Sequence, residues 1–183
     1  MLSVACGDPP TREMDQAQGA IDAARAAGAD KYATEEYGAA VNALKSAQQA
    51  VTDRDYRLAL NHALDSRDRA QAAAKLAAEQ RATQRSAAER RLGEVTAQLA
   101  QANQRYAVAA QGTRIPRRTL APVRSAIDAA DVSLQKAGTQ ITEGDYLGSQ
   151  QQLSDAAAQL RAVSSQIEGL VEGRGGRAGR GHR

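Results

Sequence analysis

The chain has 183 residues, enough for one ordinary domain or two small ones, and its composition excludes a large aromatic core. Phe and Trp are absent, and alanine is the largest part of the 42% hydrophobic fraction, so each buried side chain contributes little apolar area. The formal net charge of +3 is misleading, because residues 173–183 carry four arginines and no acid and the rest is close to neutral. Alanine has the highest helix propensity and lets helices pack closely. We therefore predict an all-α protein.

The N-terminus holds the only cysteine, Cys6, directly after Leu2-Ser3-Val4-Ala5 and directly before Gly7-Asp8-Pro9-Pro10. This pattern resembles the lipobox of bacterial lipoproteins, where cleavage before the cysteine makes it the lipidated first residue. We expect residues 1–10 to be the end of a signal peptide, a lipobox and a linker, with the remainder of the signal peptide encoded upstream. An unmodified free cysteine is the alternative. Gly7, in place of Asp, favours the outer membrane by the Gram-negative sorting rule.

Two helices are predicted in the N-terminal third of the chain. The first opens at Pro9-Pro10-Thr11 and runs to Gly28, which has the place of the glycine just past a helix end. Residues 30–33 form a short connector, after which Thr34 is the expected N-cap of a second helix. The apolar stripe of this second helix consists of Tyr37, Val41, Leu44, Ala47 and Val51.

A third helical pattern runs from about Tyr56 to Ala110, which is unusually long for a globular domain. Residues 77–91 have no large apolar side chain, so we expect either a solvent-exposed connecting helix between two packed ends or a kink near Gly93. The last part of the helix carries a seam at alternating steps of three and four residues, formed by Leu92, Val95, Leu99, Ala102, Tyr106 and Ala109. The seam is short for a self-sufficient coiled coil, so we favour packing within the chain over oligomerisation.

The C-terminal third begins with a basic loop, Thr113 to Thr119, and continues with a fourth helix near Pro122 and a fifth from Asp145 to about Leu170. The basic residues of the loop are Arg114, Arg117 and Arg118. Residues 171–183 are expected to be a disordered Gly/Arg tail. A tail of this kind can attract polyanions weakly, including lipid headgroups, through Arg174, Arg177, Arg180 and Arg183.

An internal repeat relates the second and third helices to the fourth and fifth. Leu44–Tyr56 aligns with Leu134–Tyr146, and two residues inserted upstream bring Tyr32-Ala33-Thr34 onto Leu120-Ala121-Pro122. We expect each copy to be a helical hairpin whose aspartate caps the return helix while the next tyrosine packs back onto the outgoing one. The residues in these roles are Asp55 and Tyr56, then Asp145 and Tyr146. The expected architecture is an elongated bundle of about five helices, with hairpins in residues 11–110 and 111–170 joined by the long central helix.

The first copy also resembles a known family. Ala20-Ile21-x-x-Ala24-x-x-Ala27-Gly28-Ala29-x-x-Tyr32-Ala33-Thr34, with Asp55-Tyr56-x-x-Ala59-x-x-x-Ala63, resembles the uncharacterised bacterial Ala-rich envelope lipoproteins described as domain of unknown function 4398. The resemblance extends from Thr11 to Lys75, although the family usually has Pro where Thr34 stands. The Asp-Tyr-x-x-Ala piece is also similar to part of a tetratricopeptide repeat. The resemblance implies a lipidated, periplasm-facing helical protein and brings no activity, ligand or catalytic residue.

The sequence contains no set of residues typical of catalysis. His62 has Asp65 and Ser66 within one turn, but without a second histidine or a thiolate we interpret them as a solvated helix face. Two acid pairs lie at the hairpin turns, Asp53 with Asp55 and Glu143 with Asp145. They lack the oxygen-rich loop of a calcium site, and helix capping explains them. We therefore predict no catalytic residue, metal, cofactor or small-molecule substrate.

These observations favour a non-enzymatic protein of the cell envelope. We expect it to face the periplasm, to be held at the outer membrane through lipidated Cys6, and to act as a helical scaffold or adaptor for another envelope protein. The alternative is a cytoplasmic helical protein that starts at Met1 and contacts nucleic acid through its Arg-rich tail. We favour the first, so nucleic acid is not the expected partner.

Overall fold

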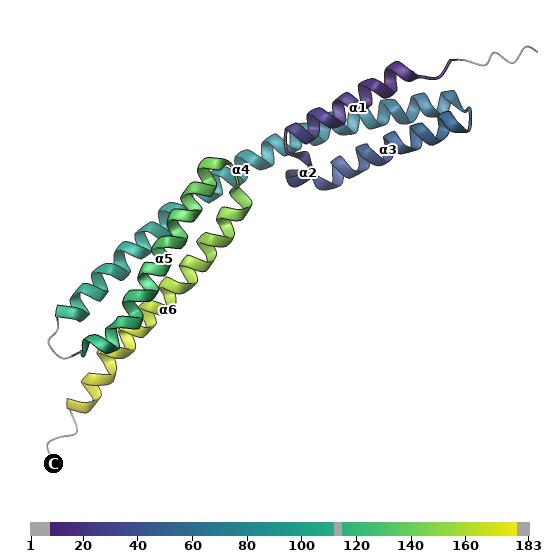
Figure 1. Cartoon of the computed structure of the whole chain (residues 1–183). Coiled ribbons are helices and arrows are strands. Elements are labelled where there is room, and N and C mark those ends of the chain that lie inside the picture. Colours follow the sequence, from purple (N-terminus) through teal and green to yellow (C-terminus); the bar gives the residue numbers. More distant parts are fainter. Residues whose placement is uncertain (1–7, 112–114, 179–183) are drawn as a thin grey trace, which may run out of the picture. The chain divides into compact units, whose positions relative to one another are not determined.

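The computed structural model describes residues 8–111 and 115–178, without the side chains of residues 173–178, and confirms the all-α prediction (Figure 1). The described residues form six helices and no strand. The helices are α1 (Thr11–Ala26), α2 (Ala29–Tyr32), α3 (Thr34–Thr52), α4 (Tyr56–Gln111), α5 (Arg117–Glu143) and α6 (Tyr146–Ala178). The helix beyond the five expected is α2, a single turn in the segment that the sequence indicated as a connector.

The chain divides into two compact units, residues 1–83 (unit 1) and 84–183 (unit 2), and α4 contributes to both. The boundary falls inside the stretch without large apolar residues, and residues 78–83 are all exposed. The helix is uninterrupted at this boundary and at Gly93. Of the predicted connection over residues 77–91, only residues 78–83 form an unbroken exposed stretch, because Ala77 and Ala88 are buried in the packed ends.

Three predicted boundaries differ from the structure. Thr34 is not an N-cap: Ala33 holds that place, no side chain caps the helix, and Thr34 is its first residue. Helix α5 begins at Arg117, before Pro122, because burial of Leu120 offsets the backbone hydrogen bond that the proline removes. Helix α6 includes residues 171–178, which we had assigned to the tail, since glycine weakens a helix without preventing it.

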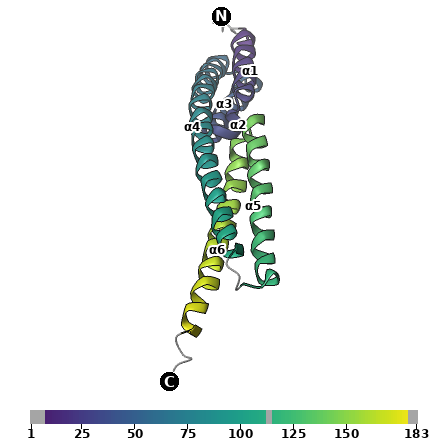
Figure 2. The same cartoon turned by 90° about the vertical axis from the view of Figure 1, so that its left-hand side faces the viewer.

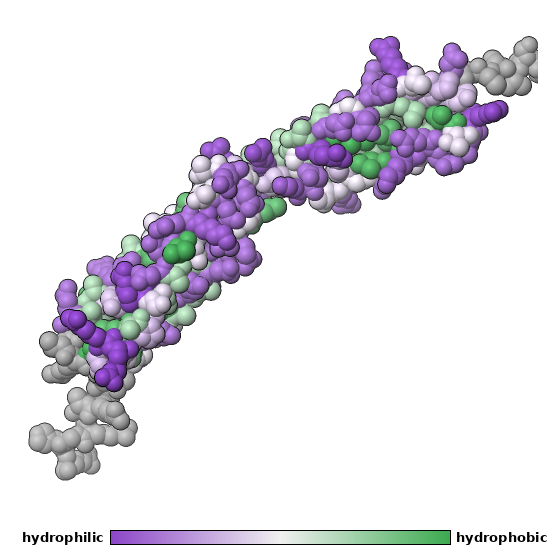
Figure 3. Space-filling model, viewed as in Figure 1, coloured by the Kyte–Doolittle hydropathy of each residue, from purple (hydrophilic) through white to green (hydrophobic). Residues whose placement is uncertain are grey.

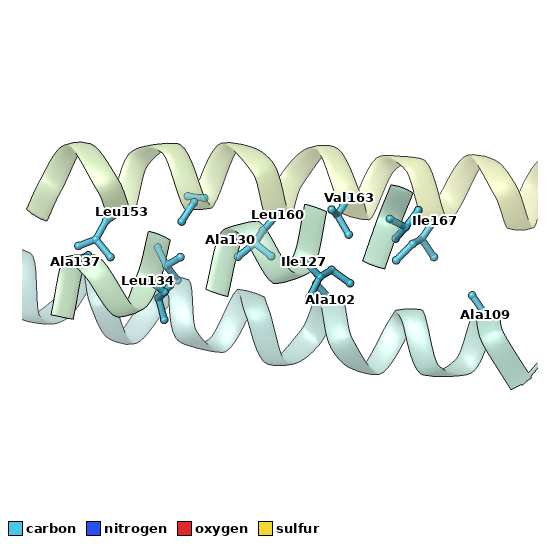
Figure 4. Packing of buried hydrophobic residues seen from close by; sticks show 14 of the residues in the cluster. Ala102, Ala109, Ile127, Ala130, Leu134, Ala137, Leu153, Leu160, Val163 and Ile167 are labelled. Atoms are coloured by element: carbon cyan, nitrogen blue, oxygen red, sulfur yellow. The ribbon is translucent and has the colours of Figure 1, made fainter. Parts of the chain in front are cut away.

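The core of unit 2 is formed by the second half of α4 together with α5 and α6. The predicted seam of α4 lies in this core, with Val95, Ala102 and Ala109 buried and the other seam residues packed against them. Figure 4 shows Leu134, Leu153 and Leu160 between the helices, and α5 and α6 lie side by side in Figures 1 and 2. The prediction of packing within the chain is therefore confirmed.

The core of unit 1 is built mainly from alanine. Its buried residues come from all four of its helices, and Ile21 and Leu44 are the large ones in the main cluster. The buried Ser66 hydroxyl on α4 donates a hydrogen bond to the backbone carbonyl of Ala40 on α3, at 2.8 Å. Because a serine side chain is short, this bond requires the backbones of α3 and α4 to lie close together.

The internal repeat holds along the whole hairpin. The difference in residue number between Tyr56 and Tyr146 also separates each of the buried positions of α4 in unit 1 from a buried position of α6. The α4 positions are Ala59, Ala63, Ser66, Ala70, Ala73 and Ala77, and the α6 positions are Ser149, Leu153, Ala156, Leu160, Val163 and Ile167. The same offset pairs buried Ala33 with buried Val123, so the two-residue insertion that we expected upstream is not required. The two copies thus share a register and differ in side-chain size.

This difference predicts that exchanging equivalent residues destabilises both units, for different reasons. Ala70→Leu should destabilise unit 1 by about 1–3 kcal/mol, because the closely packed helices have no room for the larger side chain. Leu160→Ala should destabilise unit 2 by about 2–5 kcal/mol through the cavity that it leaves. Urea unfolding followed by circular dichroism measures both, with exposed Ala82→Leu as the control. An Ala70→Leu variant as stable as the control would contradict the close approach of α3 and α4.

Candidate functional site

The two hairpin turns have the same backbone geometry. In each, the outgoing helix is followed by a residue with a positive φ angle, 61° at Arg54 and 83° at Gly144. The amide of this residue and the next amide donate hydrogen bonds to carbonyls of the last helical turn, at 2.8–3.1 Å. This pair of bonds is a Schellman motif, which satisfies carbonyls that the end of a helix leaves free. The repeat predicted from the sequence therefore extends to the backbone hydrogen bonds.

The aspartates of both turns cap the return helices, as predicted. Asp55 Oδ1 accepts a hydrogen bond from the Leu58 amide at 3.0 Å, and Asp145 Oδ1 accepts one from the Gly148 amide at 3.0 Å. Asp145 also accepts a hydrogen bond from Gln140 Nε2 at 3.1 Å. These carboxylates are thus engaged in ordering the turns.

The tyrosines that follow are not equally buried. Tyr146 is 7% exposed, whereas Tyr56 is only half-buried. In unit 2, the part of α4 around Gln84 lies beside the start of α6, because Gln150 Nε2 donates a hydrogen bond to Gln84 Oε1. The tyrosine ring is therefore more completely buried in the second copy, while its packing onto the outgoing helix stays a prediction.

The residues around His62 do not converge. Ser66 is buried and bonded to α3, while Asp65 faces solvent and pairs with Arg69 at 2.8 Å. The half-buried His62 has no hydrogen-bonding partner among the described residues. The interpretation of a solvated helix face therefore fits Asp65 but is wrong for Ser66, because this serine is buried against α3.

The acid pairs at the turns do not form a cluster either. Asp53 accepts a hydrogen bond from Gln49 Nε2 at 3.1 Å, and Glu143 is exposed. Across residues 8–111 and 115–172, no three His, Cys, Asp or Glu side chains are grouped so that they could hold a metal ion. Helix capping therefore explains Asp55 and Asp145 but not the other two acids, since Asp53 accepts from a side chain of α3 and Glu143 forms no hydrogen bond with a described residue.

A groove that the sequence did not predict lies in unit 2, where α4 ends and α5 begins. It has a volume of about 640 Å³ and is lined mainly by Tyr106, Ile115, Arg117, Leu120, Arg124 and Asp128. The Arg124 guanidinium lies 5.9 Å from the centre of the Tyr106 ring and pairs with Asp128 at 2.8 Å. Such cation–π geometry is attractive, so one wall of the groove is held in place by its own side chains.

A similar pair occurs in unit 1 between α1 and α3. Arg25 Nε donates a hydrogen bond to the Tyr37 hydroxyl at 2.8 Å, and the guanidinium lies 5.8 Å from the ring centre. The hydrogen bond with Tyr37 raises the pKa of the Arg25 guanidinium above its ordinary value. The contact therefore joins α1 to α3 at the surface and leaves the arginine charged.

Several predicted site residues lie outside what the structure describes. Cys6 belongs to residues 1–7, and Arg180 and Arg183 belong to residues 179–183. Arg174 and Arg177 are in α6, but their side chains are not described. Lipidation and the polyanion contact thus stay predictions.

Fold and surface together define a helical protein of two small bundles with a repeated hairpin and, in its described residues, no converging set of catalytic groups. None of the described helices is long and apolar enough to span a membrane. Residues 12–90 match the family model described as Domain of unknown function (DUF4398), which confirms the resemblance seen in the sequence. The matched segment covers unit 1 from residue 12 onward and continues into the first residues of unit 2. No curated protein and no solved structure matches the chain.

The unequal burial of the two tyrosines yields a prediction. Tyr146→Ala should destabilise its hairpin by about 2–4 kcal/mol, and Tyr56→Ala should cost less, because less ring surface leaves the protein interior. Thermal unfolding followed by circular dichroism measures both, with Tyr146→Phe as the control that keeps the ring. Equal losses in the two alanine variants would contradict the burial difference.

Proposed function

We propose that this protein is a non-enzymatic helical scaffold of the cell envelope, anchored on the periplasmic side through lipidated Cys6. The observation that carries the proposal is the context of the single cysteine, small residues before it and Gly7-Asp8-Pro9-Pro10 after it. The family that residues 12–90 match has no known function, so this match adds no activity to the proposal. The outer membrane is the favoured location.

The surface of the described part supports a role in holding partners. Exposed ion pairs one helical turn apart, such as Arg85 with Glu89 and Arg124 with Asp128, line the outer faces of the helices. Helices of this kind offer long, regular surfaces while their cores remain closed. In the described residues, many acids are used in ion pairs or in hydrogen bonds of the helix ends, such as Asp65 with Arg69 and Asp55 with the Leu58 amide. A scaffold or adaptor for another envelope protein requires no more than such a surface.

A second candidate rests on the Gly/Arg segment at residues 173–181. Its arginines carry the excess positive charge of the chain and could contact the phosphates of a nucleic acid in the cytoplasm. This alternative requires an unprocessed chain that starts at Met1. Deletion of residues 173–183 should then abolish co-purification of DNA or RNA.

The anchoring proposal is tested by intact-mass analysis of the protein expressed from its own locus with its upstream codons. The expected product starts at Cys6, carries two or three acyl chains and sediments with membranes, since a single chain would give only marginal anchoring. Cys6→Ser should prevent both processing and sedimentation, whereas Ser154→Ala, a change at an exposed residue of α6 far from the lipobox, should preserve them. An unmodified chain starting at Met1 in the soluble fraction would refute the proposal and favour the second candidate.

A further inference from the structure

The end of α4, the start of α5 and the last part of α6 up to residue 172 meet in unit 2. The groove between α4 and α5 brings Tyr106 and Ala110 next to Ile115 and Arg117. A second hollow brings Thr119 and Pro122 of α5 next to Gly169 and Leu170 of α6. We call this region, formed by residues 106–111, 115–124 and 168–172, the arginine end (Figure 1, where α4 ends and α5 begins).

The positive charge of the arginine end is poorly compensated. Arg117 and Arg118 are exposed, and neither forms an ion pair with a described residue. They lie in the first turn of α5, where the helix dipole is positive and acids are common, yet this turn contains no acid. Arginines placed here repel the helix end, which favours an external anion.

The acids nearby do not neutralise these two arginines. Asp128 is paired with Arg124, and Glu168 is paired with Arg105 at 2.8 Å. Glu172 is the remaining acid of this end, exposed on α6. The region therefore has a net positive charge.

The arginine end also carries exposed apolar side chains. Val171 is 57% exposed on α6, and Val108 is 67% exposed in the last turn of α4. Ile115 is partly buried at the groove. In the view of Figure 3, unit 2 has a mostly polar surface with small apolar areas between the polar ones. Basic residues mixed with exposed apolar ones are typical of surfaces that bind the headgroup region of a bilayer.

We propose that the arginine end is a peripheral binding site for anionic phospholipid headgroups. The arginines attract the phosphates, and Val171 and its apolar neighbours enter the interface between headgroups and acyl chains. A nucleic acid would use the same charges. The bases of a single strand stack on exposed aromatic rings, but the one tyrosine of this region, Tyr106, has Arg124 over its ring. The site goes beyond the proposed anchor and does not require acylation of Cys6.

Vesicle co-sedimentation tests the proposal with the full-length Cys6→Ser protein, which removes any contribution from acyl chains. We expect binding to vesicles of phosphatidylglycerol and phosphatidylcholine at low salt, weakening as salt rises, and none to pure phosphatidylcholine. Each basic residue near an anionic surface contributes about a fivefold change in affinity, so Arg117→Gln with Arg118→Gln should weaken binding about 25-fold. The matched control, Arg90→Gln with Lys136→Gln, removes two exposed charges from unit 2 outside the arginine end and should bind as the parent does.

A fluorescent reporter tests the orientation, since the chain has no tryptophan of its own. Emission of Val171→Trp should shift to shorter wavelength when anionic vesicles are added. Emission of Val132→Trp, 64% exposed in the middle of α5, should not shift. Circular dichroism of each variant verifies that it folds.

Three results would overturn the proposal. The first is the absence of binding to anionic vesicles at low salt. The second is that the Arg117→Gln, Arg118→Gln variant and the control variant weaken binding equally. The third is binding to duplex DNA without binding to vesicles. Because the protein carries no acyl chain in this experiment, none of these results bears on the anchoring of the native protein. Conversely, an unmodified Cys6 in the native protein would leave vesicle binding unchanged.

Discussion

The structure depends first on how closely alanine allows α3 and α4 to approach. A serine hydroxyl of one helix bonds directly to the backbone of the other at Ser66 and Ala40, which only near contact of the backbones permits. Short side chains give little hydrophobic area per residue, but they allow many van der Waals contacts at small separation. Unit 2 uses the same register with Leu153, Leu160 and Ile167, so its helices gain stability from larger side chains. The same hairpin thus occurs twice, packed through short side chains in unit 1 and through larger ones in unit 2.

Much of this fold could be read from the sequence because its signals are local. The hairpin turns are specified by short motifs, and the aspartate caps at Asp55 and Asp145 form as the motif indicates. Helix boundaries that depend on burial in the core were harder to predict from the sequence. Helix α5 starts ahead of Pro122 because Leu120 enters the core, and no local rule for proline contains that information. Likewise Arg54 adopts the positive φ angle that Gly144 holds, although arginine rarely favours it.

The surface features were predictable in part. The basic residues before and within the start of α5 were evident in the sequence, as was the seam that contains Tyr106. Their meeting in one groove depends on the chain reversal between α4 and α5, which brings distant residues together. The pairing of Arg124 with both Tyr106 and Asp128 likewise needs the three-dimensional structure, because one partner lies on another helix. Side chains that act across helices therefore escaped the sequence, while those that act within a turn did not.

The continuity of α4 couples the folding of two otherwise separate cores. Starting a helix is unfavourable because several residues must be ordered for the first hydrogen bond, whereas extending one is nearly free of that cost. Since one helix serves both units, the nucleation penalty for this element is incurred once. Residues 78–83 are exposed, so within this stretch the coupling depends on the backbone hydrogen bonds of the helix. A change that favours or disfavours helix there would alter the cooperativity between the units while leaving each core as it is.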